Sequence, residues 1–207
     1  MANLIPIYRE RGHLRANFRA PSAKIESDTT SNCKGGVSVT LPIEEGSVYS
    51  WGKAEWAGNA VLSNPELGAA LGMKAGELAN GLKIDKGLAS IQEAYGRKGH
   101  LASRLKTTPV FEDASRLVTY QIEVKEGSQY RMGTLTITGF SESTINRLKS
   151  KWKLQPGDVY DASYLKEFMK KEMVLDARET GAPPKSISTE LKPDRQKLTV
   201  DVTISLK

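Results

Sequence analysis

The feature that most restricts the fold of this 207-residue chain is an internal repeat. Residues 45–52, Glu-Gly-Ser-Val-Tyr-Ser-Trp-Gly, recur 81 positions later as residues 126–133, Glu-Gly-Ser-Gln-Tyr-Arg-Met-Gly. The same offset relates two further pairs of glycines, Gly58 with Gly139 and Gly76 with Gly157. Ordered matches at one spacing indicate tandem copies of one structural module, because chance matches would not keep their order over two whole copies.

A partial third copy precedes the two complete ones. Residues 8–14, Tyr-Arg-Glu-Arg-Gly-His-Leu, match residues 95–101, Tyr-Gly-Arg-Lys-Gly-His-Leu. In the complete copy this motif follows the first strand and the first helix, so the first copy lacks both of these elements. We therefore predict a truncated repeat at residues 1–46 and complete repeats at residues 47–127 and 128–207.

Each repeat ends with residues that alternate between apolar and polar. Strict alternation predicts a strand with one buried face and one solvent-exposed face. The apolar positions are Val37, Val39, Leu41 and Ile43, then Val118, Tyr120, Ile122 and Val124, then Leu198, Val200, Val202, Ile204 and Leu206. In the strand that opens each complete repeat, the apolar parity changes at Gly52 and Gly133, which predicts a β-bulge.

Two helices are predicted between these strands. Ser63 and Glu66 have the spacing of a capping box, and the equivalent helix of the last repeat begins near Ser141. The second helix of each repeat is longer and ends at Gly99 or Gly181, as a left-handed C-cap glycine would. Its apolar face is Leu88, Ile91 and Tyr95 in the middle repeat, and Leu165, Phe168, Met169 and Met173 in the last. A weaker strand follows, around residues 101–108 and 185–191.

The predicted fold class is therefore α+β. Each complete repeat has the order strand, helix, helix, strand, strand, with two helices covering one face of a three-stranded mixed sheet. A module this small buries only ~60% of the surface that its unfolded chain exposes. We expect contacts between neighbouring repeats to add stability.

These motifs and their order resemble the POTRA (polypeptide-transport-associated) domains of outer-membrane protein assembly factors, the BamA and TamA class of the surface antigen family. The matching motifs are the two Glu-Gly-Ser-x-Tyr segments, Gly-Asp-Val-Tyr-Asp at residues 157–161 and Tyr-x-x-x-Gly-His-Leu at residues 95–101. The resemblance covers nearly the whole chain. The last repeat departs from the pattern at residues 181–183, Gly-Ala-Pro, and Pro183 and Pro184 cannot donate to a strand ladder.

The resemblance implies a row of periplasmic domains at the bacterial outer membrane, preceding a C-terminal membrane β-barrel that is not part of this sequence. Such domains bind unfolded outer-membrane proteins and accessory proteins, and they help to assemble β-barrels. The implied mechanism is β-strand addition to the sheet. The resemblance also places the alternating strand centrally and the strand after Gly99 at an edge. A POTRA module of a two-partner secretion transporter is an alternative.

The strand after Gly99 is the predicted peptide-binding edge, with residues Leu101, Ala102, Ser103, Arg104, Leu105, Lys106 and Thr107. Unpaired backbone N–H and C=O groups at an edge recruit another strand with little dependence on its sequence. Arg104 and Lys106 are equally consistent with a protected edge that discourages aggregation. The glycines predicted to have structural roles are Gly46, Gly52, Gly58, Gly76, Gly99, Gly127, Gly133, Gly139, Gly157 and Gly181.

The net charge of +6 leaves a nucleic-acid-binding α+β repeat as an alternative of another class. Solvated helix faces explain the basic residues of the last repeat better, so no nucleic acid is expected. A single cysteine, Cys33, and two histidines, His13 and His100, predict no metal site or cofactor, and no catalytic pattern is present. Because both histidines follow the helix-ending glycine, a shared structural role is predicted. No apolar stretch reaches the ~20 residues of a transmembrane helix, and no signal peptide is recognisable.

Overall fold

The computed structural model describes residues 4–26, 36–180 and 187–206, apart from the side chains of residues 25, 26 and 173–180. The helices are α1 (Ile5–Glu10), α2 (Asn64–Leu71), α3 (Gly81–Arg97), α4 (Glu142–Lys151) and α5 (Tyr164–Thr180). The strands are β1 (Asn17–Phe18), β2 (Ser22–Glu26), β3 (Gly36–Thr40), β4 (Ile43–Glu44), β5 (Ser50–Ala57), β6 (Arg104–Glu112), β7 (Leu117–Lys125), β8 (Arg131–Thr138), β9 (Ile187–Asp194) and β10 (Thr199–Leu206). The chain divides into two compact units, and the boundary between them runs through the middle repeat. The units are residues 1–55, 71–88 and 107–122, and residues 56–70, 89–106 and 123–207.

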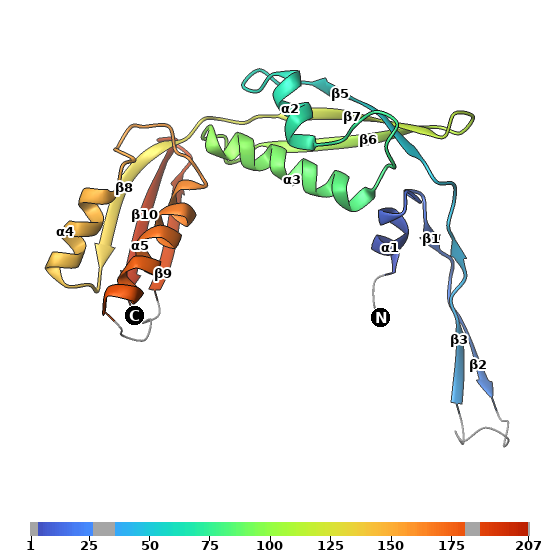
Figure 1. Cartoon of the computed structure of the whole chain (residues 1–207), viewed down its shortest axis with the longest axis horizontal. Helices are drawn as coiled ribbons and strands as arrows, with labels where there is room; N and C mark the ends of the chain where they lie inside the picture. The colour runs from blue at the N-terminus through green and yellow to red at the C-terminus, as the bar shows by residue number, and fades with distance from the viewer. Residues whose placement is uncertain (1–3, 27–35, 181–186, 207) are drawn as a thin grey trace. The chain divides into compact units, whose positions relative to one another are not determined.

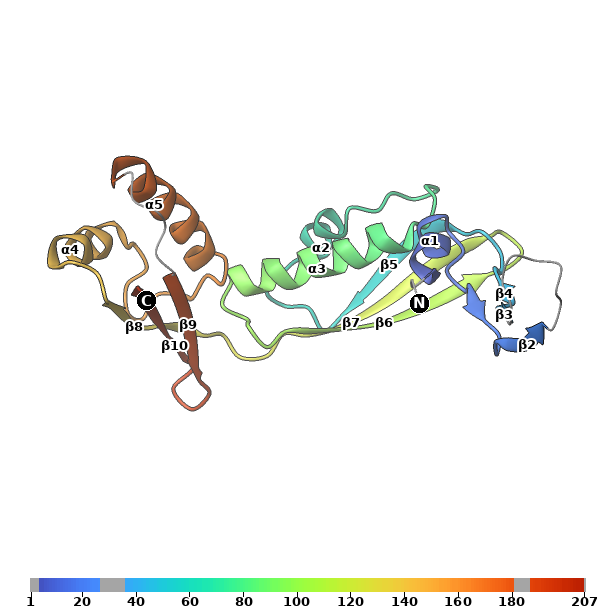
Figure 2. The same ribbon diagram turned by 90° about the horizontal axis from the view of Figure 1, so that it is seen from below.

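The predicted order of strand, helix, helix, strand, strand is confirmed in both complete repeats. Each has a three-stranded sheet, in the order β5-β7-β6 for the middle repeat and β8-β10-β9 for the last. The last sheet is mixed, since β10 pairs parallel to β8 and antiparallel to β9. Figures 1 and 2 show α4 and α5 on the same face of this sheet. The alternating strand is central, as expected.

The alternating strands supply the core. Val200, Val202 and Ile204 of β10 are fully buried, and they belong to a cluster with Leu148 of α4 and Phe168 of α5. Each fully buried aliphatic side chain contributes about 1.5–3 kcal/mol relative to its exposed state. The alternating apolar residues of β7, namely Val118, Tyr120, Ile122 and Val124, are buried as well. The predicted buried face of both strands is confirmed.

The first helix of each complete repeat starts at the predicted cap. The backbone N–H of Ser63 donates to the Glu66 carboxylate at 2.8 Å, and the Glu66 N–H donates to the Ser63 hydroxyl at 3.4 Å. This reciprocal pair is a capping box. Ser141 caps α4 by accepting from the N–H of Thr144.

The predicted bulge at Gly133 is confirmed. Along the β8–β10 ladder, Val200 pairs with Met132 while Val202 pairs with Leu135, so β8 has one extra residue there. The carboxylate of Asp201 accepts from the N–H of Thr134 at 2.6 Å and thereby pairs a group that the bulge would leave unbonded. The bulge at Gly52 stays a prediction.

The N-terminal part differs from what was expected. β3 pairs with β2, and β4 pairs with β1, so the strands of the truncated repeat form two short antiparallel ladders. Val37 and Val39 were predicted to be buried, and this prediction was wrong, since they are 61% and 59% exposed. The alternation is intact, but within the described residues β3 has only β2 as a neighbour in its sheet.

One of the two predicted outer strands begins later than expected, and residues 185 and 186, at the predicted start of the other, lie outside the described residues. β6 starts at Arg104, and residues 101–103 lie in the turn before it. β9 starts at Ile187, and it includes Pro193 near its end. Gly181, Cys33, Pro183 and Pro184 lie outside the described residues, as does the side chain of Met173.

The contrast between equivalent valines gives a direct test of the core. We expect Val118→Ala to lower the free energy of unfolding by about 2 kcal/mol, because Val118 is fully buried. Val37→Ala at the equivalent repeat position should change it by less than about 0.5 kcal/mol. Urea unfolding followed by tryptophan fluorescence measures both values, and equal losses would contradict the assigned burial.

Candidate peptide-binding edge and repeat junctions

β6 is an outer strand of the middle sheet, next to β7 alone. Of the seven residues predicted to form a peptide-binding edge, Arg104, Leu105, Lys106 and Thr107 lie in β6. Leu101, Ala102 and Ser103 lie in the preceding turn. The free edge therefore begins later than predicted and continues to Glu112.

Pro109 shows which backbone groups of β6 face the open edge. Proline has no N–H, so within a sheet it is found where that group would point away from the neighbouring strand. Alternation along β6 then turns the N–H groups of Leu105 and Thr107 away from β7, and that of Lys106 toward it. The side chains of β6 also alternate, since Leu105 and Thr107 are half-buried while Lys106 is exposed.

Equivalent hydrogen bonds define both repeat junctions. The N–H of Tyr49 donates to the carbonyl of Gly12 at 3.1 Å, and the N–H of Tyr130 donates to the carbonyl of Gly99 at 2.9 Å. The two glycines have φ values of 84° and 83°. A Cβ at Gly99 would lie 2.6 Å from the carbonyl oxygen of Tyr130, so this site excludes any other residue without a backbone shift.

The two histidines make the same contact at both junctions, which confirms their predicted structural role. His13 Nδ1 donates to the carbonyl of Gly46 at 3.1 Å, and His100 Nδ1 donates to that of Gly127 at 3.1 Å. Each ring also packs edge-on against the tyrosine five positions earlier, Tyr8 or Tyr95.

The predicted glycines are placed at turns and close approaches. A positive φ is found at Gly46, Gly58, Gly76, Gly99, Gly127, Gly139 and Gly157. Gly52 and Gly133 lie within the strands β5 and β8 instead. These conformations fit structural roles.

Glu126, in the second Glu-Gly-Ser motif, has a role that sequence reasoning missed. Its carboxylate accepts from the N–H groups of Ala60 and Val61 at 2.7 and 2.8 Å and from the hydroxyl of Tyr95 at 3.0 Å. Burial alone would raise the pKa of Glu126, but these donors hold the pKa below its ordinary value. The recurrence of the motif was the only signal that could have identified this residue.

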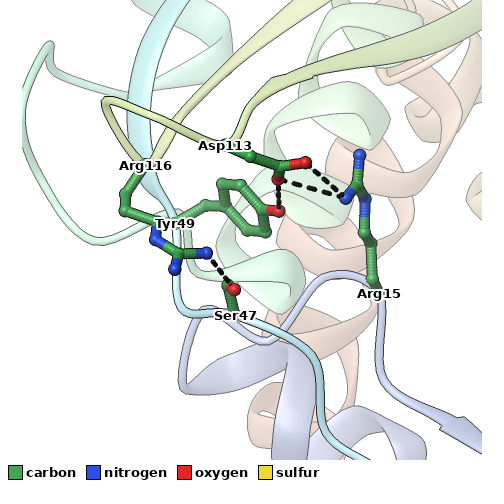
Figure 3. A network of polar contacts seen from close by, with 5 residues as sticks. All are labelled: Arg15, Ser47, Tyr49, Asp113 and Arg116. Atoms are coloured by element: carbon green, nitrogen blue, oxygen red, sulfur yellow. Dashed lines mark hydrogen bonds and ion pairs between the residues drawn. The ribbon is translucent and has the colours of Figure 1, made fainter.

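A side-chain network at the first junction was also missed. Figure 3 shows Asp113 between Arg15 and Tyr49, with the tyrosine hydroxyl donating to the carboxylate. Arg15 donates to Asp113 at 3.2 Å, and its guanidinium lies 4.2 Å from the ring centroid of Phe111. The hydrogen bond from Tyr49 is the largest cause of the lowered pKa of Asp113.

This network has no counterpart in the repeat pattern. The positions equivalent to Arg15 and Asp113 are Ala102 and Arg195, which cannot form the same ion pair. Arg116 completes the network by donating to the hydroxyl of Ser47. Because the network joins residues nearly one hundred positions apart and occurs at one junction only, neither periodicity nor motif spacing could have indicated it.

No group of three His, Cys, Asp or Glu side chains in the described part of the chain is placed to hold a metal ion. None of the helices among the same residues has the length and hydrophobicity to cross a bilayer.

The Glu126 contacts predict acid sensitivity. The folded-state pKa is lowered, so this stabilisation is complete above the unfolded pKa of about 4.3 and is lost as the pH falls through the folded-state value. Glu126→Gln should lower the free energy of unfolding at pH 7 by about 1 kcal/mol. Urea unfolding at several pH values measures the effect, and a slope below pH 5 that is unchanged in the variant would contradict the assignment. Glu123→Gln, three positions earlier on β7, is the control.

The Arg15 network predicts a local effect. Because the side chains of Arg15 and Asp113 are 45% and 64% exposed, Arg15→Ala should cost less than about 1 kcal/mol in global stability. Hydrogen exchange should nevertheless become faster around residues 8–16 and 46–49. Arg19→Ala, which breaks the exposed Arg19–Glu44 pair, should leave this region unchanged. Equal exchange in both variants would show that the network does not order the junction.

Comparison with known proteins identifies the module. The family model POTRA, described as surface antigen variable number repeat, matches residues 49–127. A putative outer membrane protein assembly factor of Treponema pallidum (strain Nichols) is 24% identical over 156 residues, which is 75% of this chain and 18% of that protein. The chain thus spans less than a fifth of its curated relative.

Two solved structures show the same fold. POTRA3-5 of Haemophilus influenzae BamA matches with a TM-score of 0.68 and 22% identity, over 99% of this chain and 77% of that one. BamA from Haemophilus ducreyi lacking POTRA domains 1-3 matches with a TM-score of 0.57 and 16% identity, over 77% and 29%. The resemblance noted in the sequence is confirmed. Residues 49–127 match the POTRA family model, and the chain has the fold of tandem POTRA-like elements and is homologous to an outer-membrane protein assembly factor.

Proposed function

We propose that this chain is a non-catalytic, protein-binding scaffold at the periplasmic face of the outer membrane. It receives unfolded outer-membrane proteins or accessory proteins for β-barrel assembly. Homology to an assembly factor supports the scaffold role, and the proposed repeat boundaries remain residues 1–46, 47–127 and 128–207. The choice of strand addition as the mechanism rests on one observation, the outer edge of β6, which has no neighbouring strand among the described residues.

A client strand would pair with the backbone of β6. The outward N–H and C=O groups of Leu105 and Thr107 lie before Pro109, which interrupts the row of donors. A client can therefore form a short ladder next to these residues. Main-chain pairing accepts many sequences, as a helper of many different β-rich clients requires.

The exposed side chains of this edge add a preference. Arg104 and Lys106 are exposed and lie on either side of Leu105. They discourage pairing between two copies of β6, because like charges would be brought together across the new ladder. A client with acidic or neutral residues at these positions avoids that repulsion.

Thr107→Pro tests strand addition. This change removes an outward N–H and leaves the β7 ladder intact, so it should weaken binding about tenfold or more, or ~1.4 kcal/mol, with little loss of stability. Binding is measured by NMR titration with an extended peptide from a β-strand of an outer-membrane protein. In the unmodified chain the shifts should centre on residues 104–108.

The matched control is Lys106→Pro, which removes an inward N–H and should destabilise the middle sheet. Shifts confined to helix faces, or equal binding by the Thr107→Pro variant, would contradict strand addition. Tighter binding of a peptide from the secreted protein of a two-partner secretion system than of the outer-membrane peptide would favour a transporter module instead. Tighter binding of single-stranded RNA than of either peptide would favour a nucleic-acid-binding protein.

A further inference from the structure

The two repeat junctions use the same backbone positions with different side chains. At the first junction, a Cβ at Gly81 would lie 2.8 Å from the Cβ of Arg9. At the second, a Cβ at Gly96 would lie 3.2 Å from the Cβ of Ala162. The repeat alignment pairs Arg9 with Gly96 and Gly81 with Ala162. Both junctions therefore have the same close approach. The glycine belongs to the later of the two repeats at the first junction and to the earlier one at the second.

An ion pair occupies this place at the first junction only. The guanidinium of Arg9 donates to both carboxylate oxygens of Asp85, at 2.8 and 3.0 Å. The alignment pairs Asp85 with Lys166. At the second junction Gly96 has no side chain and Lys166 is a cation, so the equivalent ion pair cannot form.

A groove of about 350 Å³ is found at this place in the second junction. Ala162 and Lys166 line it, together with Arg97 of α3 and Lys170 of α5. None of these three cations forms an ion pair within 4 Å of a carboxylate among the described residues. The groove therefore combines open space with three cations that have no ion-pair partner among the described residues.

We propose that this groove docks an acidic segment of a partner protein, whose carboxylates take the place that Asp85 has at the first junction. Two carboxylates, Glu93 and Glu167, also line the groove. The separate carboxylates of a peptide can reach the three cations and avoid these two side chains.

The groove is distinct from the strand-addition edge. Its lining residues belong to α3, α5 and the turn before α5, and none belongs to β6. Docking of an acidic segment thus goes beyond the proposed function, and it can hold whether or not strands add to β6.

NMR titration of the whole chain with an acetylated, amidated peptide of alternating Glu and Ser tests the proposal. We expect shifts at Arg97, Ala162 and Lys166, and about tenfold weaker binding when Lys166→Glu and Lys170→Glu are combined. Lys171→Glu, on α5 but outside the groove lining, is the matched control and should change binding by less than about twofold. Shifts spread over all basic surfaces, or equal effects of these variants, would overturn the proposal.

A graft of the first junction gives a second test. The combination of Gly96→Arg, Ala162→Gly and Lys166→Asp rebuilds the Arg9–Asp85 arrangement, so it should keep the fold by circular dichroism and lose peptide binding. Retained binding would overturn the proposal, and so would equally tight binding of inorganic phosphate, which would indicate a simple anion site. The Thr107→Pro variant should bind this acidic peptide normally, which separates a failure here from a failure of strand addition.

Discussion

The structure depends on a main-chain hydrogen bond between the tyrosine that opens one repeat and the glycine that ends a helix of the repeat before it. Each tyrosine backbone is held on both sides, since its N–H donates to the helix-ending glycine and its carbonyl accepts from Ala79 or Tyr160. Only a residue that tolerates a positive φ can present its carbonyl in this way. The path of the chain from repeat to repeat is therefore set by backbone geometry, and side chains such as His13 and His100 reinforce it.

Within a repeat, stability and binding are assigned to different strands. The central strands β7 and β10 supply buried side chains, whereas the outer strand β6 contributes an unpaired backbone edge. Prolines lie in two of the outer strands, Pro109 in β6 and Pro193 in β9. Under the proposed function, a client that paired with this edge would leave in place the side chains that hold the sheet to its helices.

Much of the fold could be predicted from the sequence because its signals are local. The alternation of β10, the capping box at Ser63 and the parity change at Gly133 each depend on residues close in the chain, and all are present in the structure. The exposure of Val37 could not be predicted in this way. Its alternation equals that of Val118, and only the elements packed against the strand distinguish them.

The candidate sites were less predictable for the same reason. The edge was expected, but its start at Arg104 was not, since residues 101–103 contain no glycine or proline that would mark a turn. The contact of Arg15 with Asp113 and the groove beside Lys166 depend on residues brought together by folding. Repeat alignment becomes informative about them only once the structure shows which positions meet.

The backbone nature of the junction has a consequence for how such chains evolve. Because the same main-chain bonds join the first repeat to the second and the second to the third, a duplicated repeat would find a compatible neighbour on either side. Unequal recombination could then lengthen or shorten the array without a new interface having to arise. Surface side chains, as the difference between Arg9 and Gly96 shows, are left to diverge and to give each joint its own binding properties.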